Sequence, residues 1–363
     1  MALTSRLAVY ERYLAREIYW ATLLVLAAFL ALFAFFDLVH ELQDVGKGNY
    51  QLQHAIGYVT LTLPGRVYEL FPIGVLIGTL YALTQLARHS EITVLRASGL
   101  STLTMLGSLA KIGALFVVLT FLVGEFIAPP AERAAQQLRL KALSSVVAQE
   151  FRSGLWVKDE TAFVNVRDVL PDTSLRDVKI YEFDKDRQLK SISEAESGIY
   201  LPPDRWKLIN VAQTIFEKDR SRVAHLDEAE WRSALNPDIL TVLMVVPERM
   251  SLTNLYLYIR HLAENQQKTQ RYEIALWKKL IYPIAALVMM ALALPFGYMH
   301  ERAGNVSVKV FAGVMLGVTF HLLNGLFSSL GVINSWTPLI AAITPSLLFL
   351  MTAAALMWWV ERR

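Results

Sequence analysis

Cysteine is absent from this 363-residue sequence. Its absence excludes disulfide bonds, thiol catalysis and metal sites built on cysteine. It does not assign any segment to a compartment, because a domain without disulfides can lie on either side of a membrane.

Several motifs of catalysis are missing as well. No GxxxxGK[ST] phosphate loop occurs, and DVGKGNY (44–50) has the wrong spacing for one. HExxH and GxSxG are absent, and no aspartate pair or chain of ionisable residues lies deep in an apolar run. We therefore expect no enzyme, no cofactor, no metal and no nucleic-acid partner, with any ATP hydrolysis on another chain.

Charged residues are scarce at 18%, against about 25% in an average soluble protein. The apolar residues gather in long runs, and a helix needs about 20 such residues to cross a bilayer. The first run is too long for a signal peptide, whose apolar region has about 7–15 residues, so we interpret it as a retained anchor. Pro129 and Pro130 are expected to end the third helix. The sequence predicts six spans, at about 16–37, 66–87, 101–127, 277–299, 308–328 and 337–360.

Lysine and arginine in short loops predict the orientation of these spans. Arg12 and Arg16 precede the first span, and Arg88 and Arg96 lie between the second and third. The opposite side has Lys47 in its first loop. We expect both termini to be cytoplasmic and the long segment after the third span to lie outside.

That segment, 130–275, alternates apolar and polar residues in its middle part, which is typical of short strands. Strands are expected in 155–166, 178–192, 205–211 and 214–219, and their spacing is compatible with a sandwich, a barrel or a jelly roll. Helical arms are expected on both sides, the second with Ser251 as its N-cap. The predicted fold is a polytopic α-helical membrane protein with an inserted all-β domain, divided into 1–129, 130–275 and 276–363.

The stretch RHSEITVLRASGLS (88–101) predicts a short helix of about eight residues. Ser90 suits the N-cap, Glu91 the first turn, Arg96 the last turn and Gly99 the left-handed position after the helix. Ile92, Val94 and Leu95 form an apolar centre with Arg88, Glu91 and Arg96 around it, as in a docking surface. The alternative is a loop helix that merely folds back on the bundle.

The SEITVLRASGLS core resembles the coupling helix of the lipopolysaccharide export permeases, the LptF/LptG family. RYLAREI resembles the N-terminus of that family, and the order of three spans, one large domain and three spans is the same. GKGNY (46–50), GEFIAPP (124–130) and SGLWVKD (153–159) are more similar to LptG-type than to LptF-type members. The resemblance implies a transporter subunit of the bacterial inner membrane with a periplasmic β-jellyroll domain.

The resemblance also implies partners. These are an LptF-type subunit, two copies of a cytoplasmic LptB-type ATPase, a single-span LptC-type protein, an LptA-type periplasmic bridge and lipopolysaccharide as cargo. Two other hypotheses remain at this point: a membrane scaffold or receptor that displays a β domain without transport, and an enzyme acting on lipid. An exporter with a large domain after its first span is excluded by the topology.

Residue roles follow from the same resemblance. The coupling helix would contact the ATPase through Arg88, Ser90, Glu91, Ile92, Val94, Leu95 and Arg96. The apolar walls of a lipopolysaccharide cavity would be Leu24, Phe29, Phe33 and Phe36 in span one and Phe311, Val314, Met315 and Val318 in span five, with ordinary helix packing as the alternative. Its basic rim would be Arg133, Arg139 and Lys141. The jellyroll lining would be Trp156, Phe163, Ile180, Phe183 and Phe216, which a plain β core explains equally well.

Two groups of polar residues, at the end of span one and within span five, have no single explanation from the sequence. Where some relatives carry lysine at the outer end of span one, this sequence has Asp37, Glu41 and Asp44. In span five, His321 and Asn324 lie on one helical stripe, and either a substrate or pH-sensing role or hydrogen bonding between helices would explain them.

Overall fold

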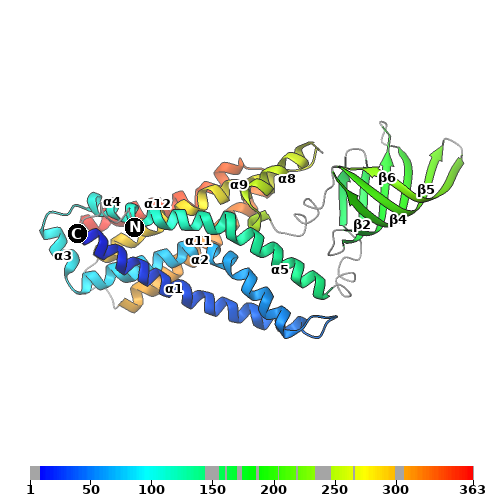
Figure 1. The fold of residues 1–363 in the computed structure, drawn as a ribbon. Helices are drawn as coiled ribbons and strands as arrows, with labels where there is room; N and C mark the ends of the chain where they lie inside the picture. Colours follow the sequence, from blue (N-terminus) through cyan, green and yellow to red (C-terminus); the bar gives the residue numbers. More distant parts are fainter. Residues whose placement is uncertain are drawn as a thin grey trace.

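The computed structural model consists of a long helical bundle and a six-stranded antiparallel sheet inserted between its two halves (Figure 1). It describes residues 9–143, 155–159, 162–169, 174–184, 188–202, 204–217, 220–233, 247–264, 266–298 and 306–362. Within these residues six helices are long and apolar enough to cross a membrane. The chain is therefore a polytopic α-helical membrane protein with an inserted β domain, as predicted.

The first half of the bundle runs from α1 to α5. Its elements are α1 (Val9–Glu41), the short η2 (Leu42–Asp44), α2 (Leu52–Arg88), α3 (Glu91–Ala97), α4 (Thr102–Leu122), the π-helical η3 (Val123–Ile127) and α5 (Ala128–Leu143). The second half has η4 (Pro247–Arg249), α8 (Leu252–Glu264), α9 (Gln270–Ile281), η5 (Tyr282–Ile284), α10 (Ala285–Tyr298), α11 (Val306–Ile333) and α12 (Pro338–Glu361).

The expected end of the third span at Pro129 is wrong. α4, η3 and α5 form one continuous helix, because the π turn shifts the backbone hydrogen bonds and the N–H of Ala128 binds the carbonyl of Val123. Pro129 and Pro130 lie just after this π turn, which shifts the backbone hydrogen bonds where the prolines donate none. Ser251 is an N-cap as predicted, since its hydroxyl accepts a hydrogen bond from the N–H of Asn254 at 3.2 Å. The arm that follows is two helices, α8 and α9, rather than one.

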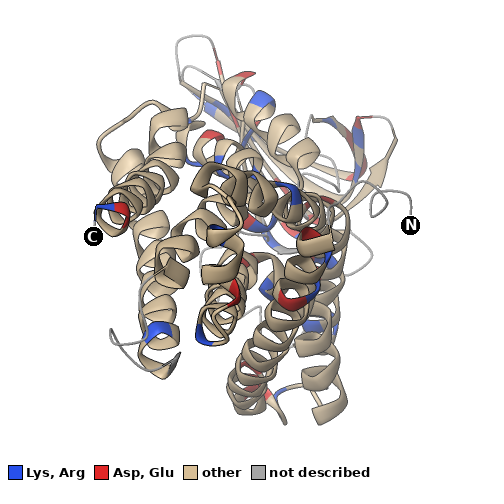
Figure 2. Cartoon of the chain, turned by 90° about the vertical axis from the view of Figure 1, so that its left-hand side faces the viewer, with Lys and Arg blue, Asp and Glu red and all other residues tan. Residues whose placement is uncertain are grey.

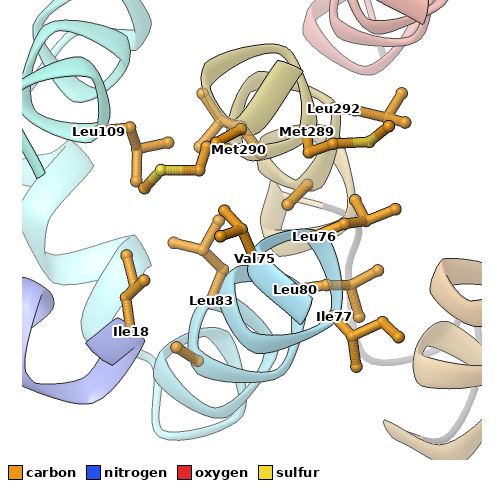
Figure 3. Packing of buried hydrophobic residues seen from close by; sticks show 14 of the residues in the cluster. Ile18, Val75, Leu76, Ile77, Leu80, Leu83, Leu109, Met289, Met290 and Leu292 are labelled. Atoms are coloured by element: carbon orange, nitrogen blue, oxygen red, sulfur yellow. The ribbon is translucent and has the colours of Figure 1, made fainter. Parts of the chain in front are cut away.

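The core of the bundle surrounds α2. Its residues from Leu70 to Leu80 are all buried, so this part of α2 is covered on every side. Side chains of α2 such as Leu76 meet Met289 and Met290 of α10, with Ile18 of α1 and Leu109 of α4 at the edge of the cluster (Figure 3). α2 is thus the central helix on which the other spans are arranged.

Small residues allow α1 and α11 to approach α2 closely. A Cβ atom added to Gly78 would lie 2.6 Å from the backbone of Thr22 in α1. A Cβ atom on Gly317 of α11 would lie 2.7 Å from the side chain of Ile73. Such contacts bring helix backbones together where lipid and protein side chains are equally apolar. α1 and α11 are therefore two outer helices seated on the same central one.

The sheet contains β1 (Leu155–Asp159), β2 (Ala162–Val169), β3 (Leu175–Phe183), β4 (Leu189–Leu201), β5 (Arg205–Glu217) and β6 (Arg220–Arg232). Each strand pairs with its neighbour in sequence, so the described strands form an antiparallel meander. The two strands expected in 205–211 and 214–219 are one strand, β5, because Ala212 and Gln213 continue the pairing with β4.

In β3 and β5 the usual alternation of buried and exposed side chains is interrupted at one position. Leu175 and Val178 are both buried although they lie three residues apart, and so are Leu208 and Val211. Asp177 and Asn210 lie between them with φ of 49° and 54°. A residue with a positive φ shifts the alternation of side chains by one position. The buried side chains before and after it therefore lie on the same face of the sheet.

The bundle has two distinct ends. The beginning of α1, the end of α12 and the short helix α3 lie at one end, and the sheet lies beyond the other (Figure 1). In the view onto the end that carries α3, most of the helical ribbon has neither acidic nor basic residues (Figure 2). Charged side chains within the bundle are therefore few, and their partners matter.

Candidate functional site

The helix α3 follows α2 after a connection of only two residues, His89 and Ser90. It ends as the sequence predicts: Gly99 has φ of 95°, its N–H binds the carbonyl of Arg96 at 3.0 Å, and the N–H of Leu100 binds the carbonyl of Leu95 at 3.1 Å. These two bonds form a Schellman motif, which fixes the end of a helix too short to be stable alone.

Two expectations about α3 are wrong. Ser90 precedes the helix, but it has φ of 59° and its hydroxyl accepts no hydrogen bond from the helix, because the short connection uses this residue to turn the chain. Ile92 is not part of an exposed apolar centre, since only 3% of it is exposed and it packs into the core of the bundle. Val94 is the exposed apolar residue, at 67%, and Leu95 is half-buried.

Contacts with two other helices, α10 and α1, hold α3 in place. Ile92 lies beside Gly297 of α10, and the guanidinium of Arg96 lies 4.8 Å from the ring centre of Tyr298. The hydroxyl of Tyr13 in α1 donates to Glu91 at 3.4 Å. Arg88, Val94 and Arg96 remain exposed. α3 thus has one face seated on the bundle and another, with Val94 and Arg96, open, and the exposed Arg88 at the end of α2 precedes it.

Lys111, in the half of the third span that lies nearer to α3, has a protein partner. Its ammonium group donates to Glu11 of α1 at 2.8 Å, and the hydroxyl of Ser108 donates to the same carboxylate at 2.9 Å. Glu11 is buried. Lys111 therefore faces a protein partner, and the beginning of α1 is attached to α4 by charge as well as by packing.

The predicted cavity walls divide into two groups. Leu24 and Phe36 of α1 and Phe311, Met315 and Val318 of α11 are exposed. Phe29 and Phe33 of α1 and Val314 of α11 are partly buried against the core. Both helices pack on α2 through the close contacts described above. The structure therefore leaves an apolar surface on each of these two helices, and places three of the eight predicted residues mainly in packing.

The acids at the C-terminal end of α1 and in η2 are neutralised by arginines of the same chain. Arg66 of α2 donates to both carboxylate oxygens of Asp37, at 2.9 and 2.8 Å. Arg139 of α5 donates to Asp44 at 2.6 Å and lies 3.7 Å from Glu41. Burial and a hydrogen bond to Glu41 raise the pKa of Tyr50, which therefore stays a donor. The three acids are structural partners of two arginines.

The three predicted rim residues have different surroundings. Arg139 is occupied by Asp44 and stacks 5.5 Å from the ring of Tyr58. Arg133 has one long hydrogen bond, to the carbonyl of Pro129 at 3.5 Å, and Lys141 is exposed. Arg133 and Lys141 are therefore the two rim residues that form no ion pair within the part of the chain that the structure describes.

A charged network that sequence reasoning missed lies at the same end of the bundle. Arg249 of η4 donates to Glu132 of α5 at 2.7 Å and lies 3.9 Å from Glu69 of α2. Burial opposes the charge of Arg249, but Glu132 and Glu69 together raise its pKa above the usual value. The signal in the sequence was a set of acids at the ends of apolar runs, but Arg249, which joins them, lies more than a hundred residues from both Glu132 and Glu69.

The π turn η3 positions one more member of this network. Glu125 accepts hydrogen bonds from the N–H of Leu252, the first residue of α8, at 3.1 and 2.9 Å. The buried Lys279 of α9 lies 3.7 Å from the same carboxylate and also donates to the carbonyl of Met250. Glu125 thus combines the favourable end of a helix dipole with an ion pair and attaches α8 to the bundle.

A cavity of about 160 Å³ lies beside this network. Its lining comes from α2, η3, α5, η4, α9, η5 and α11 and includes Lys278, His321, Asn324 and Gly325. Interhelical hydrogen bonding was one explanation for His321 and Asn324. Among the described residues neither side chain has a hydrogen bond to another helix, and both face the cavity instead.

The five residues predicted as the jellyroll lining lie on two opposite faces of the sheet. Ile180 is buried in the core face together with Val164 and Val178. Trp156, Phe163 and Phe216 are exposed, and Phe163 contacts Phe183 with ring centres 5.8 Å apart. By strand alternation these four aromatic residues belong to the opposite face. Only Ile180 lies in the described hydrophobic core, and no group of acidic and histidine side chains suited to a metal ion occurs among the described residues.

Comparison with known proteins gives one consistent result. The sequence profile described as "Lipopolysaccharide export system permease LptF/LptG" matches residues 12–359. The protein named "Lipopolysaccharide export system permease protein LptG" from Haemophilus influenzae is 32% identical over 355 residues, which cover 97% of this chain and 98% of that protein. The protein of the same name from Escherichia coli K12 is 29% identical over 357 residues, with 98% of each chain covered. The similarity thus extends over both helical halves and the inserted sheet.

Proposed function

The chain belongs to the LptF/LptG family of lipopolysaccharide export permeases, and from this premise we propose that it is the LptG-type transmembrane subunit of an exporter driven by a separate ATPase. Membership of the family makes it an inner-membrane component of lipopolysaccharide transport and a transporter subunit rather than an enzyme. The proposal adds how energy enters the chain and where the lipid is handled.

The observation that carries the proposal is the open face of α3. Val94 is an exposed apolar residue with Arg88 and Arg96 nearby, on a helix fixed at both ends at the extremity of the bundle opposite the sheet. An apolar centre with a charged rim is typical of a docking surface. The sequence contains no phosphate loop, so ATP-driven work must enter through contact with another protein.

The orientation follows from the same proposal. α3 and both ends of the described chain would face the cytoplasm, and the sheet would lie in the periplasm, as the distribution of lysine and arginine predicts. An LptF-type subunit would pair with this chain, and an LptC-type protein and an LptA-type bridge would receive the lipid on the periplasmic side.

The substrate path would use the exposed apolar residues of α1 and α11. Leu24, Phe36, Phe311, Met315 and Val318 offer surface for acyl chains, and Arg133 and Lys141 offer positive charge for a phosphorylated head group. The exposed aromatic face of the sheet, with Trp156, Phe163 and Phe216, would be a further apolar surface beyond the membrane.

The test is purification of the full chain from its native membrane, with identification of bound lipid and protein. We expect lipopolysaccharide, an LptF-type subunit and a cytoplasmic ATPase to copurify, and ATP to drive release of the lipid. A scaffold or receptor would lack the ATPase, and a lipid enzyme would turn over lipid in detergent without any partner. Absence of both ATPase and lipopolysaccharide would refute the proposal.

A further inference from the structure

Two neighbouring lysines of α9 differ in their partners. Lys279 is buried, lies 3.7 Å from Glu125 and donates to the carbonyl of Met250. Lys278 has no ion pair or hydrogen bond among the described residues, and its side chain lines the cavity between α2, α9 and α11. The first lysine is part of the network that joins the helices, whereas the second presents a free ammonium group.

Two more donors share the cavity with Lys278. Asn324 of α11 is only 8% exposed, and its side-chain amide has no partner among the described residues. His321, one helical turn earlier, is exposed and lines the same cavity. The polar atoms of this amide are accessible from the cavity rather than fully enclosed. The cavity therefore presents an open amide beside a lysine that has no ion pair among the described residues.

The charges around the cavity favour an anion at Lys278. Glu132 is bound by Arg249, and Glu69 is bound by Arg66 at 3.2 Å. Glu248 is exposed and forms no ion pair with Lys278 among the described residues. Glu132 and Glu69 are thus already paired with arginine, and Glu248 acts on Lys278 across space without a direct ion pair. A phosphate group accepts hydrogen bonds from ammonium, amide and imidazole donors together, and a cavity of about 160 Å³ exceeds the roughly 30 Å³ of one water.

The mouth of the cavity adjoins an apolar surface. His321 and Gly325 lie one turn apart on α11 and are both exposed. The exposed apolar residues Met315, Val318, Leu322 and Leu326 lie along the same helix. An acyl chain placed on this surface would bring its head group to the mouth between His321 and Gly325. A lipid therefore fits this geometry better than a free ion.

We infer that this cavity binds the phosphate of a lipid head group, with Lys278 as the charged contact and Asn324 and His321 as further hydrogen-bond donors. The inference deepens the proposed function and rests on it for the identity of the lipid. None of these three residues belongs to the coupling helix, the apolar walls or the basic rim.

Binding is measured on the full chain in phosphatidylcholine nanodiscs that contain a small fraction of phosphatidic acid, without ATPase or lipopolysaccharide. We expect Lys278→Met to lower the amount of bound phosphatidic acid about tenfold, and Lys278→Arg to retain most of it. Lys268→Met is the matched control, because Lys268 is an exposed lysine just before α9 and outside the cavity. It should leave binding unchanged.

A second variant tests the cavity itself. No atom lies within 4 Å of a Cβ atom placed on Gly325, so Gly325→Leu would fill the mouth while every polar group stays in place. It should lower phosphatidic acid binding as much as Lys278→Met. Equal binding by wild type and both variants would overturn the inference, and so would equal binding of diacylglycerol. Saturation of the site by inorganic phosphate alone, with no preference for phosphatidic acid, would overturn the lipid as the source.

The outcomes separate this inference from the proposed function. A chain that binds phosphatidic acid through Lys278 but copurifies with neither lipopolysaccharide nor ATPase would refute the proposed function alone. A chain that exports lipopolysaccharide while Lys278→Met binds phosphatidic acid normally would refute this inference alone.

Discussion

The Nη2 atom of Arg139 in α5 lies 2.6 Å from Oδ2 of Asp44 in η2, which follows the C-terminal end of α1. This ion pair joins two residues 95 positions apart and explains why α1 can end in acids. Glu41 lies on the other side of the same guanidinium, and Tyr50 donates to Glu41 at 2.7 Å. The relationship makes Arg139 a structural residue as well as a member of the predicted basic rim.

Arg139→Gln should lower the free energy of unfolding by about 1–3 kcal/mol, because it leaves the buried Glu41 without its cation. Denaturant titration in mixed micelles measures this. Asp44→Asn in the same chain should recover only part of the loss, since Glu41 remains. Arg133→Gln is the control and should change stability by less than about 0.5 kcal/mol. A larger loss for Arg133→Gln than for Arg139→Gln would contradict the assignment.

Val94→Arg should weaken binding of the ATPase partner at least about tenfold, because it places a charge at the exposed apolar centre of α3. Stability of the chain should not change. Ile92→Ala should do the reverse and lower stability by about 2–4 kcal/mol, since Ile92 fills the core beside Gly297. Pull-down of the ATPase and thermal unfolding of the free chain distinguish the two effects. Loss of ATPase binding only with unfolding would argue against a docking role for Val94.

Gly78→Ala should destabilise the bundle by about 1–3 kcal/mol, because its Cβ atom would meet the backbone of Thr22 at 2.6 Å. Gly107→Ala is a matched control on α4, where no atom lies within 4 Å of the added Cβ. Alanine there should be neutral or stabilising by up to about 1 kcal/mol. The two variants are compared by thermal unfolding in detergent. Equal effects would show that α1 does not lie this close to α2.

Glu125→Gln should lower the free energy of local unfolding of α8 by about 1–3 kcal/mol, because the buried Lys279 loses its carboxylate partner. Faster hydrogen exchange at the beginning of α8 is the expected signature. Glu264→Gln, which breaks the exposed pair with Arg260 on the same helix, should give no measurable change. If exchange in α8 is the same in all three chains, Glu125 does not attach this helix.

Asn210→Val should destabilise the sheet by about 1–3 kcal/mol, because a β-branched residue is strained at φ of 54°. Asn210→Gly should be close to neutral, since glycine adopts this conformation without strain. Hydrogen exchange of the β4 and β5 amides reports the difference. Equal protection in both variants would show that the left-handed turn of the strand is not required.

Some features were predictable because they depend on neighbouring residues. The apolar runs predicted all six spans, and Gly99 and Ser251 marked helix boundaries that the structure confirms. β1 and β2 were expected around residues 159 and 160. The predictions at Ser90 and Pro129 were wrong because the local backbone is unusual at both places. Ser90 lies in a two-residue connection with a positive φ, and Pro129 follows a π turn.

The candidate site was less predictable, because its geometry joins distant segments. Ile92 was expected to be exposed from the composition of its own helix, but α10 covers it. The partners of Asp37 and Asp44 lie on α2 and α5, and those of Glu125 lie on α8 and α9. Asp177 and Asn210 place residues three apart on the same face, which a period of two cannot predict.

The sequence by itself determined that this chain spans a membrane, that a β domain interrupts it, that α3 ends at Gly99 and that no phosphate-loop motif is present. Each of these depends on composition or on residues within one or two turns of each other. Only the tertiary structure decided which charged and polar side chains have a partner among the described residues. Arg139 and Lys279 are occupied by acids from other helices, whereas Lys278 and Asn324 face an open cavity, because electrostatic pairing depends on distance in space and not on separation along the chain.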